Sequence, residues 1–320
     1  MKLSLKNILI VGLIVFVITS GFARKWLFEA GPLNNNVYIL VAKGSGTYAV
    51  ANKLYKEGII NKPWLFKLAA RFMKLDKKLK AGEYHFAPSI SMFDVIQKLA
   101  NGNVVYRKIT LAEGLTTIQM LQIINEEEML TGNITLTPKD GELLPETYTF
   151  MRGDTRDSIV LQAQNAMKNA VDIAWNRRDD KLPLKNINEL LVLASIIEKE
   201  TSIDSERTLV SSVFINRLIK GMKLQTDPTV IYALTLGKKD LGRLLTRKDL
   251  LIDSPYNTYK YYGLPPSPIC NPGLSSLKAA ANPEISDFLY FVADGQGGHN
   301  FAKSLKEHNN NVRAWKKIKK

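Results

Sequence analysis

A charge-free apolar segment near the N-terminus constrains this chain more than any other feature. After Lys2 and Lys6, the 17 residues NILIVGLIVFVITSGFA (7–23) contain no charged side chain. As a helix they are roughly 25 Å long, which is short but sufficient to span the apolar layer of a membrane. We therefore expect residues 1–25 to form a cytoplasmic tip followed by a transmembrane anchor.

Two other interpretations of this segment stay open. The small residues of GFA (21–23) suit a signal-peptide cleavage site, although Arg24 and Lys25 directly after them disfavour cleavage. A buried helix of a soluble protein is the third option. Basic residues flank the segment almost equally on both sides, so the positive-inside rule barely sets its orientation.

The composition narrows the possible classes of protein. A chain of 320 residues is long enough for about two domains, and its 45% apolar and 23% charged residues are ordinary for a globular protein. The net charge of +14 suits an anionic partner such as phospholipid, an acidic cell-wall polymer or nucleic acid. The single cysteine, Cys270, excludes an intramolecular disulfide, and three scattered histidines give no metal-ligand spacing. We expect no metal and no cofactor, and the lack of a recognised motif argues against nucleic acid.

Apolar periodicity predicts a small unit after a linker at 26–36. The expected elements are a strand at 37–42, helices at 46–59 and 62–75, a strand at 81–86, and a helix at 91–102 that ends at Gly102. Because a strand, two helices and a strand are the order of a LysM module, we expect a LysM-like α/β subdomain over 37–106. Ten Lys or Arg accompany two acidic residues between Lys43 and Lys80. This excess indicates either a solvated face or contact with an anionic surface or glycan.

The remaining chain is expected to hold a connecting segment and a larger domain. Residues 108–129 weakly repeat the first strand–turn–helix pattern, so we expect a connecting α/β segment over 107–153 that ends in a loop at 131–150. Helical patterns follow at 154–175 and 205–222, and two strands surround a glycine-rich turn at 288–301. The sequence therefore predicts an α+β protein whose larger, mixed α+β domain covers 154–320.

One helix end places carboxylates where they are costly to bury. In LVLASIIEKETS (191–202), a run of apolar and small residues leads directly into Glu198, Lys199 and Glu200. At about 100° per residue, Glu200 continues the apolar face, Lys199 faces solvent, and Glu198 lies at the margin of that face. Burial raises the pKa of a carboxyl group unless a cation or hydrogen-bond donors pair with it. A carboxylic acid with a raised pKa can protonate the leaving oxygen of a glycosidic bond.

A structural interpretation of Glu200 is also open, in which Arg207, Arg217 or a helix N-terminus holds the carboxylate. A conventional glycosidase would need a second carboxylate roughly 5–9.5 Å away. Glu198 cannot supply it, because residues two positions apart on a helix face different directions. Asp227 or Glu206 could, although Asp227 is expected to cap a helix that has Pro228 in its first turn. A mechanism with one carboxylate is therefore worth considering.

Several long blocks of the sequence are similar to one known family. They are LASIIEKETSIDSERTLVSSVFINRL, GMKLQTDPTVIYAL, YNTYKYYGLPPSPICNPGLSSLKAAANP and FLYFVADGQGGHNFAKSLKEHN, with ITLAEGLT and GELLPETYTF upstream. In order and spacing they resemble the YceG-like family, the endolytic murein transglycosylases often called MltG. The resemblance covers most of residues 189–309. The chain departs from the family pattern at LLPETY and in its short anchor.

The resemblance implies a single-pass inner-membrane protein with its body on the periplasmic, extracytoplasmic side and its catalytic domain over 154–320. It implies that Glu200, the second Glu of EKET, cleaves nascent peptidoglycan strands between MurNAc and GlcNAc and so terminates strand elongation. The cut is non-hydrolytic and leaves a 1,6-anhydro-MurNAc end. Peptidoglycan synthases are further partners that the family implies. The alternative is a noncatalytic peptidoglycan-binding scaffold of the same fold.

Other polar and aromatic residues in these blocks are candidates for holding the glycan, because aromatic rings stack on sugars and amides bind hydroxyl groups. They are Gln225, Thr226, Asp227, Tyr256, Asn257, Tyr259 and His299. For each of them a role in a turn or in packing is also open. His299, in GGHNF, could orient Glu200 or close a hairpin.

Overall fold

The computed structural model describes residue 21 and residues 24–318. The predicted anchor, residues 1–25, therefore lies mostly outside the described residues. Within the described part of the chain, no helix is both long enough and apolar enough to cross a membrane. The chain divides into two compact units. Unit 1 runs up to Arg107 and includes Phe150–Gly153, and unit 2 comprises Lys108–Thr149 together with Asp154–Lys320.

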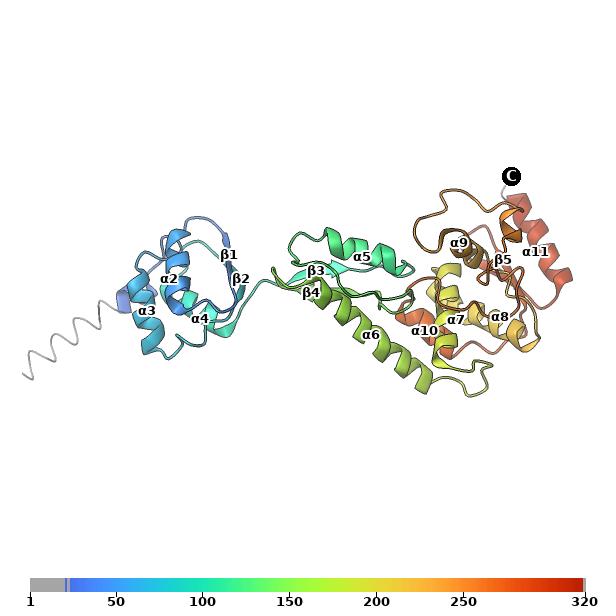
Figure 1. Cartoon of the computed structure of the whole chain (residues 1–320), viewed down its shortest axis with the longest axis horizontal. Coiled ribbons are helices and arrows are strands. Elements are labelled where there is room, and N and C mark those ends of the chain that lie inside the picture. Colours follow the sequence, from blue (N-terminus) through green and yellow to red (C-terminus); the bar gives the residue numbers. More distant parts are fainter. Residues whose placement is uncertain (1–20, 22–23, 319–320) are drawn as a thin grey trace, which may run out of the picture. The chain divides into compact units, whose positions relative to one another are not determined.

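Unit 1 has the expected order of a strand, two helices and a strand (Figure 1). Its elements are β1 (Val37–Val41), α2 (Thr47–Lys56), α3 (Pro63–Phe72), β2 (Gly82–Phe86) and α4 (Met92–Asn101). The two strands pair antiparallel, with Tyr38 opposite His85 and Ile39 opposite Tyr84. Because side chains alternate between the two faces of a strand, Ile39 and Tyr84 are buried against the helices while Tyr38 is exposed.

Local signals fix the ends of α4 and the edge of unit 1. Ser91 accepts a hydrogen bond from the Asp94 N–H (3.1 Å), and Gly102 ends the helix with φ of 74°, as the sequence predicts.

The buried Glu83 carboxylate receives Arg107 at 2.9 Å and Arg152 at 3.3 Å. These ion pairs attach Phe150–Gly153 to unit 1, although that segment lies far along the chain.

Unit 2 is mostly helical, with two small two-stranded sheets formed by β3 with β4 and by β5 with β6. Its elements are β3 (Arg107–Thr110), α5 (Thr117–Glu126), β4 (Thr147–Phe150), α6 (Arg156–Asn176), α7 (Ile187–Glu200), α8 (Arg207–Ile219), α9 (Asp227–Thr235), α10 (Leu274–Ala281), β5 (Tyr290–Ala293), β6 (His299–Ala302) and α11 (Leu305–Ile318), with short 3₁₀ turns at Asp204–Glu206 and Asp249–Leu251. The central helix is α7, which contacts α6, α8, α9 and α10 (Figure 1). The expectation of a mixed α+β fold is confirmed.

Three elements of unit 2 were not expected from the sequence. The strand β4 lies in a segment expected to be a loop, and α10 lies in a stretch rich in tyrosine, asparagine and proline. The helix α11 is polar on average and has no buried residue, so its hydrophobic signal is weak. The strand β4 and the helix α10 pair with or pack on segments distant in sequence, and periodicity within a short window does not report such contacts.

Candidate active site

The last turn of α7 places Glu200 at the wall of a cleft in unit 2. Asn186 caps the start of α7 by accepting a hydrogen bond from the Glu189 N–H (3.0 Å), and the apolar residues that follow fix the rotation of the helix in the core. The cleft has a volume of about 470 Å³. Its lining includes Gln225, Thr226, Asp227, Tyr259, Arg217, Tyr290, Phe291 and His308. Glu200 is thus half-buried, with its carboxyl group between the core and an open cleft.

The environment of Glu200 favours retention of its proton. Burial raises the pKa of this carboxyl group from its usual 4.5 to about 6. The Thr226 hydroxyl donates a hydrogen bond to Glu200 Oε1, which opposes part of this rise, whereas the nearby Asp227 carboxylate adds to it. The salt bridges of the described residues do not include Glu200. The acid is therefore poised to exchange a proton near neutral pH.

Glu200→Gln is expected to stabilise the protein at neutral pH and not in acid. The raised pKa means that the folded chain holds this proton more tightly than the unfolded chain, so the cost of the buried charge is absent below pH 4.5 and complete above about pH 6. That difference corresponds to about 2 kcal/mol. Urea unfolding of both proteins at about pH 4 and about pH 8 measures it. An equal difference in stability at the two pH values would contradict the assignment.

The sequence predicts that Asp227 caps α9, and this prediction is wrong. Thr226 occupies the N-cap position and Asp227 is the first helical residue. The Thr226 N–H donates to Thr258 Oγ1 (3.1 Å), which fixes the backbone at that point without a side-chain cap. The Asp227 carboxylate instead accepts a hydrogen bond from the Tyr259 hydroxyl (2.6 Å). Asp227, Thr226 and Tyr259 thus meet Glu200 in one cleft.

Tyr256 and Asn257 do not line this cleft. The fully buried Asn257 side chain donates to the Leu250 and Ile252 carbonyls (3.0 and 2.8 Å) and accepts from the Tyr259 N–H (3.0 Å). The Tyr256 ring packs on Tyr232, with ring centres 4.8 Å apart. Both residues therefore shape the loop that presents Tyr259 to the cleft.

His299 is also outside the lining of the cleft. It is the first residue of β6, and its direct partner is Glu206. The ring Nδ1 lies 2.7 Å from Glu206 Oε2, and the His299 N–H donates to Oε1 at 2.9 Å. The Glu206 carboxylate is therefore engaged by His299 of the β5–β6 hairpin.

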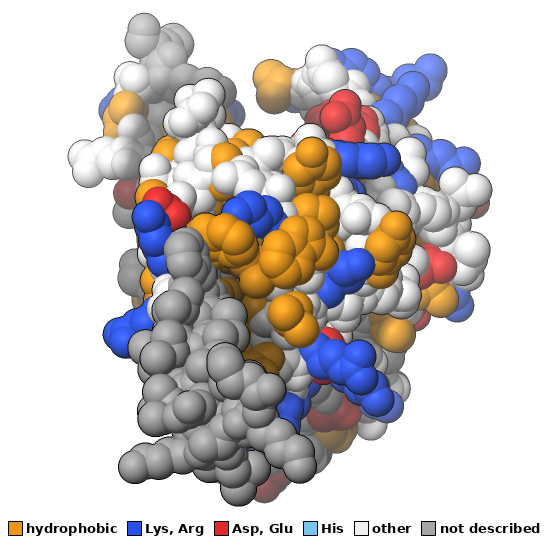
Figure 2. Space-filling model, turned by 90° about the vertical axis from the view of Figure 1, so that its left-hand side faces the viewer, with side chains coloured by type: hydrophobic (Ala, Val, Ile, Leu, Met, Phe, Trp, Pro, Cys, Tyr) orange, Lys and Arg blue, Asp and Glu red, His pale blue; other side chains and the backbone are white. Residues whose placement is uncertain are grey.

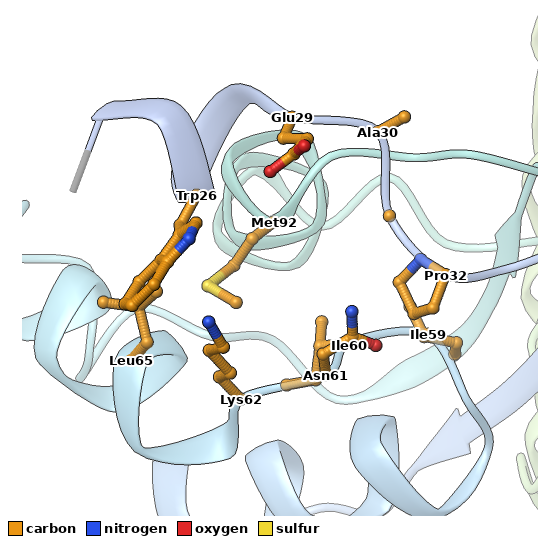
Figure 3. Close-up of a pocket in the computed structure, with 11 residues that line it drawn as sticks. Trp26, Glu29, Ala30, Pro32, Ile59, Ile60, Asn61, Lys62, Leu65 and Met92 are labelled. Atoms are coloured by element: carbon orange, nitrogen blue, oxygen red, sulfur yellow. The ribbon is translucent and has the colours of Figure 1, made fainter. Parts of the chain in front are cut away.

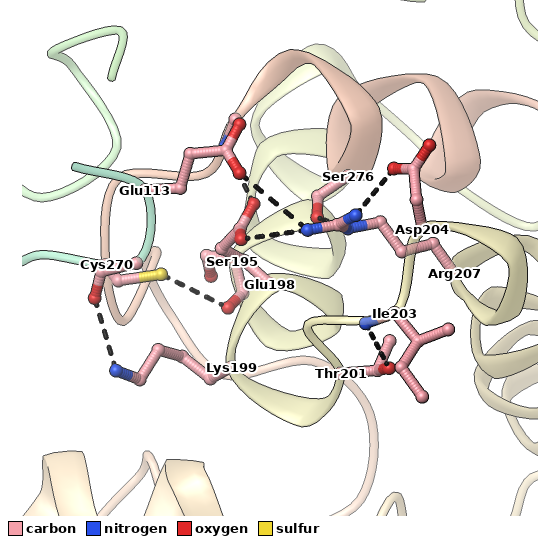
Figure 4. Close-up of polar contacts among 12 residues, drawn as sticks. Glu113, Ser195, Glu198, Lys199, Thr201, Ile203, Asp204, Arg207, Cys270 and Ser276 are labelled. Atoms are coloured by element: carbon pink, nitrogen blue, oxygen red, sulfur yellow. Dashed lines mark hydrogen bonds and ion pairs between the residues drawn. The ribbon is translucent and has the colours of Figure 1, made fainter. Parts of the chain in front are cut away.

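Glu198 is half-buried, which fits the expected position at the margin of the apolar face, but its side chain is covered. Only 5% of its side chain is exposed. Arg207 reaches Glu198 Oε1 at 3.5 Å, and the Gly273 N–H donates to Oε2 at 2.8 Å (Figure 4). Arg207 also contacts Glu113 at 3.7 Å and Asp204 at 2.6 Å. The covering residues are Arg207, at the start of α8, and Gly273, just before α10.

The two carboxylates of the EKE run thus have different surroundings. Glu198 fits the structural interpretation, since a buried arginine and a backbone N–H satisfy it. A Cβ at Gly273 would lie 1.8 Å from Glu113 Oε1, so a side chain there would displace the Glu113 carboxylate. Glu200 instead accepts a hydrogen bond from the Thr226 hydroxyl and borders the open cleft. Of these two carboxylates, Glu200 lines the cleft and Glu198 does not.

Arg217 was expected only as a structural partner of Glu200, and His308 was not expected at the site, yet both line the cleft. Arg217 is buried and donates to the carbonyls of Leu289 (2.6 Å) and Leu224 (2.8 Å), which aims its charge toward Glu200. His308 stacks on Tyr290 with ring centres 5.2 Å apart, and its Nδ1 has no hydrogen-bond partner among the described residues. Both residues occur in or beside the family-like blocks, but their spacing from Glu200 gave no local signal.

Glu200 is a half-buried carboxylic acid with a raised pKa, in a cleft lined by tyrosines and polar side chains. Enzymes that cleave glycans use sites of this kind. Residues 39–314 match the YceG-like family, and the chain belongs to this family. The family expected from the sequence blocks is thereby confirmed.

Similar proteins extend over most of the chain. A Bacillus subtilis (strain 168) protein named endolytic murein transglycosylase is 34% identical over 304 residues, which cover 85% of this chain and 83% of the relative. A Streptococcus pneumoniae (strain R6) protein of the same name is 30% identical, covering 87% of this chain but 58% of that relative. The crystal structure of a yceG-like protein from Listeria monocytogenes matches with a TM-score of 0.53 and 31% identity, over 86% of this chain and 99% of that one.

Proposed function

We propose that this protein is an endolytic murein transglycosylase, a lyase that cleaves peptidoglycan glycan strands with Glu200 as its catalytic acid. The observation that supports this most directly is the state of Glu200. Its pKa is raised to about 6, the salt bridges of the described chain do not include it, and it lines an open cleft. A noncatalytic scaffold is disfavoured, because in that case we expect a salt-bridged Glu200 and a closed cleft.

The chemistry needs one acid that acts twice. Protonated Glu200 donates its proton to the glycosidic oxygen between MurNAc and GlcNAc as the bond from that oxygen to C1 breaks. The resulting carboxylate removes the proton from the C6 hydroxyl of the same MurNAc, and O6 bonds to C1. The products are a 1,6-anhydro-MurNAc end and a GlcNAc hydroxyl, so atoms and charge balance without water. A pKa near ambient pH suits both steps.

The cleft offers groups that could hold the sugars on either side of the bond. Tyr259, Tyr290 and Phe291 supply aromatic surface, and Gln225 and Asp227 supply polar atoms. Gln225 has φ of 52°, an uncommon backbone conformation for a residue other than glycine. Such conformations cluster at ligand sites, which supports a binding role for Gln225. Tyr256, Asn257 and His299 are proposed to support this site from outside the cleft.

Thr226→Val is expected to move the basic limb of the activity profile to higher pH. In the wild type, kcat/KM should fall as Glu200 ionises through about pH 6. A hydrogen bond to a charged group contributes about 1.5–3 kcal/mol, so losing the Thr226 hydroxyl raises the pKa of Glu200 by about one to two units. Thr226→Ser keeps the hydroxyl and should keep the wild-type profile. Coincident profiles for the Val and Ser variants would argue against this control of Glu200.

The mass of the glycan products tests the proposed reaction. Transglycosylation leaves anhydro ends, whereas hydrolysis adds one water to each cut. Hydrolysis has one observation in its favour, since the Asp227 carboxylate shares the cleft with Glu200 and could act as a second carboxylate. Mass spectrometry of strands cut by the purified protein distinguishes the two. Reducing ends would overturn the one-acid mechanism, and uncut strands would favour the scaffold.

We further propose that residues 1–25 anchor the protein in the inner membrane, with the folded body outside the cytoplasm. The charge-free segment 7–23 and a substrate outside the cytoplasm support this topology. Unit 1 is proposed to act as a LysM-like module, and peptidoglycan synthases are proposed as partners. Protease treatment of intact spheroplasts tests the topology, because only a body on the outer side is digested.

A further inference from the structure

The helix α3 has an apolar stripe that faces solvent. Trp64, Leu68 and Phe72 are 54%, 59% and 90% exposed. They are four residues apart, so they lie on one side of the helix. The other side of α3 buries Leu65, Phe66, Ala69 and Ala70 in the core of unit 1. The stripe therefore lies outside the core of unit 1, and exposed apolar patches of this kind mark interaction sites.

Basic side chains border the stripe. Arg71 on α3 and Lys74 just after it are exposed. Lys67 lies over the Tyr48 ring at 4.6 Å. Figure 2 shows apolar side chains gathered on the face of unit 1 that carries α3, with Lys and Arg around them. An apolar stripe with a basic border is the pattern of helices that lie in the interface of an anionic membrane.

The stripe lies beside the point where the N-terminal segment joins unit 1. Residues 24–28 are helical, and the Trp26 ring meets the Trp64 ring edge-on with centres 6.4 Å apart. The Lys62 ammonium group lies 3.2 Å from the centre of the Trp26 ring, and Figure 3 shows it pointing toward Trp26. The 17 charge-free residues 7–23 end directly before this point. If they enter a bilayer, α3 is held at its surface.

We propose that α3 docks on an anionic phospholipid bilayer. Trp64, Leu68 and Phe72 enter the boundary between headgroups and acyl chains, while Arg71 and Lys74 pair with lipid phosphates. This contact would add a second attachment to the proposed anchor and hold unit 1 against the membrane. It goes beyond the proposed function and does not depend on the chemistry of Glu200.

A membrane suits this surface better than a glycan or a second copy of the chain. A helix face is convex, whereas sugar sites are concave and present polar groups that converge on hydroxyls. The hollow beside Trp26 has a volume of only about 120 Å³. A stable dimer buries about 1,200 Å² or more of total surface, which three side chains cannot supply. Charge complementarity favours phosphate, since the border of the stripe is basic.

A spin label at position 72 tests the docking. The full-length Phe72→Cys protein, carrying a nitroxide, is reconstituted into vesicles of phosphatidylcholine alone or with phosphatidylglycerol, and flotation confirms that it is bound. Power-saturation EPR then compares accessibility to oxygen, which partitions into lipid, with accessibility to a water-soluble nickel chelate. Tyr38→Cys is the matched control, because Tyr38 is 57% exposed on the sheet face away from the helices. Cys270 is buried, and the unsubstituted protein gives its background labelling.

With phosphatidylglycerol, we expect the ratio of oxygen to nickel accessibility at position 72 to rise several-fold over that at position 38. The rise should be lost in phosphatidylcholine alone and in the Arg71→Glu, Lys74→Glu double variant. Water-like accessibility at position 72 in both vesicles would overturn the proposal. Restricted accessibility that is independent of lipid, and present in detergent, would assign the stripe to residues 1–23 or a second copy. A change at position 72 on adding soluble glycan strands, without lipid, would assign it to glycan.

Discussion

Glu200→Gln is expected to abolish the formation of 1,6-anhydro ends while leaving the fold intact. Glutamine is nearly isosteric and can still accept the Thr226 hydrogen bond, but it can neither donate the catalytic proton nor take one back. General acid–base catalysis contributes up to about 10⁴-fold, and here one group performs both roles. We therefore expect a loss of about that size. Mass spectrometry of products from equal amounts of wild type and variant measures it.

The matched control is Glu198→Gln, which makes the same change two residues away on the same helix. Glu198 faces Arg207 and the Gly273 N–H instead of the cleft, so this variant should keep anhydro-product formation at temperatures where it is folded. Folding of both variants is verified by circular dichroism. If Glu200→Gln kept wild-type activity, or if Glu198→Gln alone removed it, the assignment of the catalytic residue would be wrong.

Arg207→Met is expected to lower the free energy of unfolding by about 3–5 kcal/mol. Arg207 and the Glu198 side chain are 8% and 5% exposed, so removing the guanidinium group leaves a buried carboxylate without its cation. Ser276 also loses the hydrogen bond that Arg207 Nε donates at 3.2 Å. Urea unfolding at neutral pH, followed by circular dichroism, measures the change.

The double variant Glu198→Gln, Arg207→Met tests the cause of this loss. It removes the uncompensated charge, so we expect it to recover part of the stability lost in Arg207→Met. Additive effects of the two substitutions would show that packing around Arg207 matters and the ion pair does not. A loss below about 1 kcal/mol for Arg207→Met would place this pair in the class of exposed ion pairs.

The elements of unit 1 could be predicted from the sequence because their signals are local. The strands alternate, the helices have apolar stripes, and Gly102 ends α4 in the left-handed conformation it favours. The direction of Glu200 was predictable for the same reason, since the helical repeat alone sets which face a residue shares. Its proposed catalytic role came from the resemblance to a family.

What could not be predicted depends on segments far apart in the chain. Gly273, 75 residues from Glu198, helps to cover the Glu198 carboxylate. The helix α9 begins one residue earlier than expected, with Thr226 and not Asp227 at its N-cap, and Thr258 fixes the Thr226 backbone. The helix α11, which is polar on average and has no buried residue, brings His308 to the cleft. Each of these outcomes follows from tertiary contacts, which a reading of local periodicity does not contain.

The Thr226 hydroxyl that reaches Glu200 is itself positioned by Thr258, one residue before Tyr259 in the wall of the cleft. A sugar that displaces Tyr259 pulls on the same short loop. Any such displacement that weakens the Thr226 contact makes Glu200 retain its proton more strongly. By thermodynamic reciprocity, the protonated acid then favours the occupied loop. Filling of the cleft and protonation of Glu200 would therefore be coupled. Near pH 6 about half of the empty protein would carry the proton on Glu200, and binding of a strand would raise that fraction.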